Sequence, residues 1–102
     1  MIIDVSRKLY QLSGKPMIDQ AEDGTAVDAV VRTALVNVAL SPDSKDDGVK
    51  KVKKYELAKK IYMAKDVVDL TVEELAMLRK GVEANYPPLI CGQLVDILEG
   101  KE

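Results

Sequence analysis

The fold of this 102-residue chain is decided by residues 71–90, which read TVEELAMLRKGVEANYPPLI. Thr71 and Glu74 form a capping box, because the threonine hydroxyl can accept from an early helical amide while the glutamate reaches back. The helix that starts here is expected to end near Asn85, since the diproline that follows cannot continue it. One face of this helix carries apolar side chains at helical spacing, namely Leu75, Leu78 and Val82.

Three further helices are predicted around this stretch. A final helix over about 88–99 begins with a proline, which suits the first helical position. A helix over 46–64 has Ser44 as its cap candidate, with an aspartate three residues on. A helix over 25–40 has Thr25 as its cap and stops before a Ser-Pro pair.

The N-terminal residues favour extended structure. Residues 2–20 alternate in part between apolar and polar side chains, and Ser13-Gly14 provides turn chemistry, so a short hairpin is expected there. Residues 67–70 are interpreted as a brief extended linker. The predicted fold is therefore mainly α with a small N-terminal β-hairpin (α+β) and about four helices. Residues 1–102 are expected to form one compact domain, with an extended element over 1–20 and a helical body over 25–99.

The composition argues against catalysis and against bound cofactors or metals. The chain has no His, no Trp, no Phe and one Cys, so imidazole bases, His-ligated metal sites and disulfides are excluded. Neither a phosphate-binding glycine loop nor a nucleophile elbow occurs in the sequence. Cys91 sits among apolar residues and is expected to be a small buried side chain. The protein is therefore expected to be no enzyme, with no cofactor and no metal site.

Residues 45–65 concentrate the positive charge of the chain. They hold eight lysines against three acidic residues, a local net of +5, so the remaining residues carry −7. A candidate basic patch for phosphate backbones lies here: Lys50, Lys53, Lys54 and Lys60. Against nucleic-acid binding stand the whole-chain charge of −2 and the lack of Arg in this segment. The simplest interpretation of these lysines is a solvated helix face. An acidic protein partner is a second interpretation, and nucleic-acid binding is kept as the alternative function of the chain.

Two features indicate contact with a partner protein. The helix over 25–40 is apolar on two sides, with Val36 and Leu40 on the smaller strip, so it is either central to its own domain or shared with another subunit. Tyr55 and Tyr62 lie seven residues apart and so share a helix face. They are either core or boundary packing, with the hydroxyl reaching water, or anchors for a partner. We predict these four residues as an interface, and a homo-oligomer as the assembly.

The sequence also gives an expectation for compartment and context. An acidic N-terminus and the lack of a long apolar run argue against a signal peptide or a membrane span, so a cytoplasmic protein is expected. Stretches at 55–62, 68–75 and 86–94, with the opening 3–16, resemble small uncharacterised proteins of tailed bacteriophages and prophages. The resemblance implies an accessory protein of the bacterial cytoplasm with a phage or host protein as partner. Assembly support or host-factor inhibition, by protein–protein interaction and self-association, is the expected function.

Overall fold

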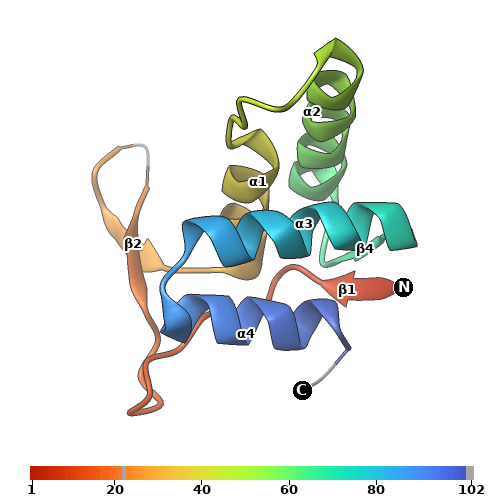
Figure 1. The fold of residues 1–102 in the computed structure, drawn as a ribbon. Coiled ribbons are helices and arrows are strands. Elements are labelled where there is room, and N and C mark those ends of the chain that lie inside the picture. The colour runs from red at the N-terminus through yellow and green to blue at the C-terminus, as the bar shows by residue number, and fades with distance from the viewer. Residues whose placement is uncertain (22, 101–102) are drawn as a thin grey trace.

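A computed structural model describes residues 1–21 and 23–100 of the chain. The elements within this part follow one another in the order shown in Figure 1: β1 (Ile2–Asp4), β2 (Ile18–Gln20), β3 (Ala26–Asp28), α1 (Val31–Leu40), α2 (Gly48–Met63), β4 (Val67–Asp69), α3 (Val72–Asn85) and α4 (Pro88–Leu98). The expected class, mainly helical with four helices and a small β element, is confirmed.

Strand β1 pairs with β4, far along the chain. The two strands are antiparallel, and Ile3 lies opposite Val68, both of them buried. The prediction of an extended linker over 67–70 was therefore incomplete, because Val67–Asp69 is a paired strand. The predicted turn at Ser13-Gly14 is present, since the Gln11 amide donates to the Lys15 carbonyl at 2.8 Å and Gly14 has a φ of +89°.

Strands β2 and β3 form a hairpin, and β3 lies where the first residues of the predicted 25–40 helix were expected. The carboxylate of Asp23 accepts from the Thr25 amide (3.0 Å) and hydroxyl (2.7 Å), and the hydroxyl bond is the main reason why the pKa of Asp23 is lowered. Thr25 is thus part of an Asp-Gly turn, and its prediction as a helix cap was wrong. The same short polar side chains serve both caps and turns, and here the turn prevails. Helix α1 begins only at Val31.

Helix α2 starts two residues later than predicted. Asp47 caps it by accepting from the Lys50 amide at 2.8 Å, so the prediction of Ser44 as the cap was wrong. The guanidinium of Arg32 on α1 donates to three carbonyls at the end of α2, those of Tyr62, Ala64 and Lys65. These bonds satisfy carbonyls that have no partner within the helix and place a cation at its negative end.

The capping box at the start of α3 is confirmed. The Thr71 hydroxyl accepts from the Glu74 amide at 3.2 Å, and a Glu74 carboxylate oxygen accepts from the Thr71 amide at 2.9 Å. Helix α3 ends at Asn85, and α4 begins at Pro88 as predicted. The starts of α3 and α4 both follow from local chemistry, because the residues that set each start lie within a single helical turn.

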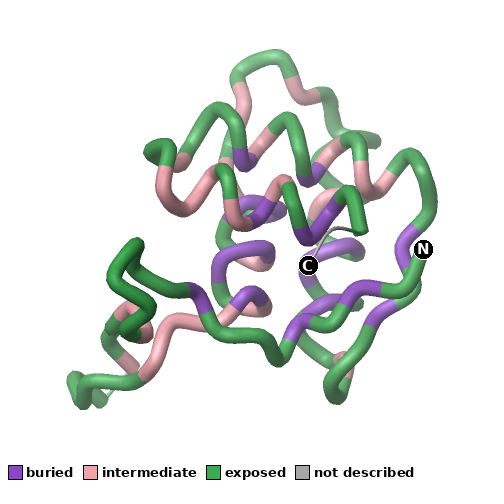
Figure 2. Tube along the Cα trace, turned by 90° about the horizontal axis from the view of Figure 1, so that it is seen from below, coloured by how far each residue is buried: buried purple, intermediate pink, exposed green. Residues whose placement is uncertain are grey.

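All four helices contribute to one core. Helix α1 packs against α2 and α3, and α3 packs against α4. The buried residues gather where these elements meet, whereas the projecting β2–β3 arm is exposed or half-buried (Figures 1 and 2). The Gln93 side chain on α4 ties the base of this arm to the helices, because it accepts from the Tyr10 amide and donates to its carbonyl, both at 2.8 Å.

We expect Glu74 to make folding stability dependent on pH below about 4.5. Burial raises the pKa of Glu74, but the Thr71 amide and the Lys60 ammonium at 2.9 Å outweigh it, so the pKa lies below its ordinary value of 4.5. The folded state then binds this proton more weakly than the unfolded chain. The resulting stability is complete above the ordinary pKa and is lost as pH falls through the folded one.

Urea denaturation of Glu74→Gln between roughly pH 6 and 3 tests this expectation. The variant should be less stable than the parent near neutral pH, and the difference should shrink as the pH falls. Glu73→Gln is the matched control, because it removes the same charge from the same turn without breaking the capping box. A difference between Glu74→Gln and the parent that stays constant down to pH 3 would contradict the argument.

Candidate interaction surface

The side of α2 that faces away from the core carries large apolar side chains in water. The buried face of this helix consists of Leu57, Ala58 and Ile61. The opposite face has side chains that are between 56 and 70% exposed, and five of them are apolar or aromatic: Val49, Val52, Tyr55, Tyr62 and Met63. Together with Glu56 and Lys59, which are also exposed, we term these residues the outer face of α2.

The outer face follows directly from helical spacing. Val52, Glu56, Lys59 and Met63 recur at intervals of four, three and four residues, which places them on one side of a helix. The buried Leu57 lies roughly opposite to them. The aliphatic side chains and Met63 thus stand towards the two ends of the face, one acidic and one basic side chain occupy its middle, and the two tyrosines lie along one flank.

The four predicted interface residues divide between different environments. Tyr55 and Tyr62 are both exposed, so of the two packing interpretations the core position is wrong, and a boundary position or a partner contact is what their exposure allows. Leu40 is 55% exposed at the end of α1. Val36 is partly buried and packs against the core, so the structure does not bring it together with the tyrosines on one open surface.

The predicted basic patch is largely neutralised by neighbouring carboxylates. Lys53 and Lys60 reach across to α3, where they lie 3.3 Å from Glu73 and 2.9 Å from Glu74. Lys54 pairs with Asp46. Of the four lysines, Lys50 alone forms no ion pair within the described part of the chain. The sequence shows the lysines but not these partners, because the pairs with α3 join residues 14 and 20 positions apart.

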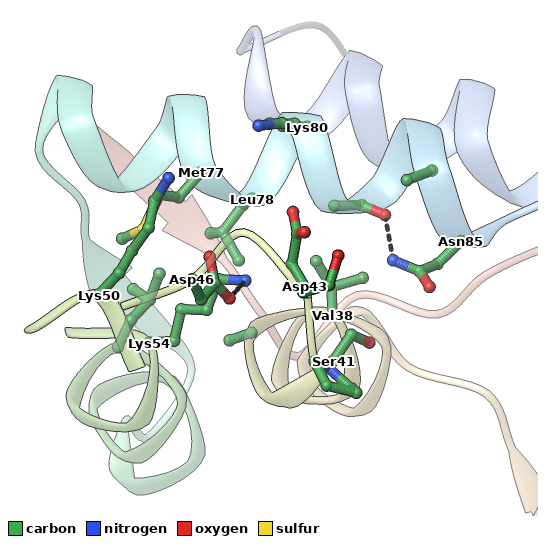
Figure 3. A pocket seen from close by; sticks show the side chains of 16 residues that line it. Val38, Ser41, Asp43, Asp46, Lys50, Lys54, Met77, Leu78, Lys80 and Asn85 are labelled. Atoms are coloured by element: carbon green, nitrogen blue, oxygen red, sulfur yellow. Dashed lines mark hydrogen bonds and ion pairs between the residues drawn. The ribbon is translucent and has the colours of Figure 1, made fainter. Parts of the chain in front are cut away.

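A cavity of about 310 Å³ lies between α3 and the segment that joins α1 to α2 (Figure 3). Val38 and Leu78 contribute apolar wall, and the carboxylate of Asp46 forms an ion pair with Lys54. The Asp46 side chain is only 3% exposed, and its Oδ1 has no hydrogen-bond partner among the described residues. The pair holds the 41–47 segment onto α2, which gives it a structural role.

Other candidate sites have little chemistry to offer. Cys91 lies in the first turn of α4, partly buried against the core. Within residues 1–21 and 23–100, no three Cys, Asp or Glu side chains gather in a way that would hold a metal ion. None of the helices described is both long enough and apolar enough to cross a bilayer.

Comparison with known proteins adds no further identification. No family model matches the chain, and neither a curated protein nor a solved structure is significantly similar to it.

Proposed function

We propose that this chain is a non-catalytic interaction protein that self-associates through the outer face of α2. One observation carries the proposal: five large apolar side chains, each more than half exposed, lie on a single helix face opposite the core. Burying such side chains contributes about 25 cal/mol per Å² of apolar surface removed from water. An apolar face of this kind is typical of a surface that binds another protein.

The residue types on this face favour a protein partner over a nucleic acid. Tyr55 and Tyr62 offer large apolar rings with a polar tip, and tyrosine is enriched at the energetic centres of protein interfaces. Three of the four lysines of the predicted basic patch, Lys53, Lys54 and Lys60, are already engaged with carboxylates of this same chain. Glu56 and Lys59 add both signs of charge to the face, which suits a partner surface of mixed charge.

A phage context remains part of the proposal. It rests on the resemblance of the 55–62, 68–75 and 86–94 stretches to small proteins of tailed bacteriophages. Within that context, a self-associating chain of this size would support particle assembly or bind and inhibit a host protein. The self-association itself depends on the outer face of α2 and not on this context.

Analytical ultracentrifugation over a wide concentration range tests self-association. We expect the parent chain to shift from monomer to dimer with rising concentration, and the variant V52S/M63S to remain monomeric. Leu12→Ser is the matched control, because Leu12 is 94% exposed in the turn between Gln11 and Lys15, outside α2. This variant should associate like the parent. A parent chain that stays monomeric up to about 1 mM would overturn the proposal.

A further inference from the structure

We infer that two copies of this chain pair their α2 helices antiparallel about a two-fold axis, with Glu56 of each copy against Lys59 of the other. The inference rests on the proposed self-association and adds the partner, the orientation and the register. It is carried by the order of charges and apolar groups along the outer face of α2.

Five positions along the length of this face have the spacing of a coiled-coil seam. Val49, Val52, Glu56, Lys59 and Met63 recur at alternating intervals of three and four residues. This is the spacing of a and d positions, at which the side chains of one helix pack between those of another. All five are exposed, so no element among the described residues buries this seam, and of the five, Val49 and Glu56 border hollows shared with α3.

Charge along the seam selects the orientation. In a parallel pair, equivalent positions meet, so Glu56 would face Glu56 and Lys59 would face Lys59 of the second copy. In an antiparallel pair, a positions meet d positions, and each Glu56 faces a Lys59 of the other chain. Like charges placed opposite each other are unfavourable, whereas opposite charges select partner and register. The antiparallel pair is therefore the favoured one.

Two of the three apolar seam residues, Val52 and Met63, fit the same register, whereas the position opposite Val49 lies beyond the end of α2. Residues 56 and 59 lie symmetrically about a point between positions 57 and 58, and residues 52 and 63 lie symmetrically about that same point. A two-fold axis there brings Val52 of each copy onto Met63 of the other while forming both charge pairs. Each contact then occurs twice, as an isologous interface requires.

The flanks of the seam also agree with this arrangement. Tyr55 and Tyr62 lie on one flank, so the two-fold axis places tyrosines of one copy beside tyrosines of the other, a contact that aromatic rings favour. On the other flank stand Lys53 and Lys60, and both are paired with α3 carboxylates of their own chain. That pairing reduces the repulsion between the lysine flanks of the two copies.

Charge reversal on the seam tests the register. Glu56→Lys and Lys59→Glu should each raise the dimer dissociation constant at least tenfold, because each gives like-charged pairs in the antiparallel dimer. The double variant E56K/K59E should restore dimerisation to within about threefold of the parent. In a parallel dimer the single variants would only exchange one set of like charges for another, so no loss followed by rescue is expected.

Disulfide trapping gives a second, independent measurement. In a C91A background, an oxidised mixture of V52C and M63C chains should form mainly the mixed cross-linked dimer, while V52C alone should cross-link poorly. If V52C alone cross-links best, or if the charge variants bind like the parent, the antiparallel register is wrong while self-association stands. A parent chain that never dimerises overturns the proposed function itself.

Discussion

The variant Lys54→Met is expected to lose about 3 kcal/mol of folding free energy. Lys54 is the partner of Asp46, whose side chain is 3% exposed. Removing the ammonium leaves a buried carboxylate with one oxygen newly unpaired and the other already without a partner among the described residues. Breaking a buried pair by removing one member is costly, because the desolvation of the remaining charge is no longer compensated.

A double-mutant cycle separates this effect from lost packing. Asp46→Ala should cost less than Lys54→Met, because Lys54 is 21% exposed and can turn its ammonium towards water. The double variant D46A/K54M should then be more stable than K54M alone, since it removes the stranded charge. Urea denaturation measures all four proteins.

Lys50→Met is the matched control for this cycle. Lys50 lies one turn earlier on α2, is exposed and forms no ion pair within the described residues. Its replacement should change stability by no more than about 0.5 kcal/mol. If Lys54→Met were as mild as Lys50→Met, water would have to reach the Asp46 carboxylate, and the pair would contribute little to holding the 41–47 segment.

Sequence patterns predict the parts of this fold whose causes are local. The Thr71–Glu74 capping box and the proline start of α4 lie within single turns, so both boundaries could be predicted. The Thr25 cap failed although it met the same rule, because Asp23-Gly24 makes a competing turn. The pairing of Ile3 with Val68 joins distant segments, so no local pattern contains it.

The candidate interface likewise combines features that the sequence predicts with features that only the structure shows. The seven-residue spacing of Tyr55 and Tyr62 correctly predicts a shared helix face, but spacing alone cannot say whether that face is buried or exposed. The lysine cluster was visible in the sequence, while the carboxylates that neutralise it come from α3 and from the segment before α2. The spacing does not single out Glu56 and Lys59, because their place in the interface depends on the exposure of their neighbours on the helix.

The variant Gly81→Ala is expected to destabilise the protein by about 2 kcal/mol, although alanine ordinarily stabilises a helix relative to glycine by about 1 kcal/mol. A Cβ at position 81 would lie well inside van der Waals contact of the Val38 Cγ1 methyl group. Val38 is buried on α1 and branched at Cβ, so its methyl groups have few other positions available. The new methyl group therefore has to push α1 and α3 apart.

Two comparison variants identify close packing as the cause. Gly92→Ala is the matched control, because Gly92 lies in α4, is exposed and has nothing within 4 Å of an added Cβ. It should gain stability by up to about 1 kcal/mol. Val38→Ala removes the methyl group that position 81 meets, so G81A/V38A should be more stable than the sum of the two single effects predicts. If Gly81→Ala instead gained stability as Gly92→Ala does, α1 and α3 could separate without cost, and the absence of a side chain at position 81 would not be what sets their distance.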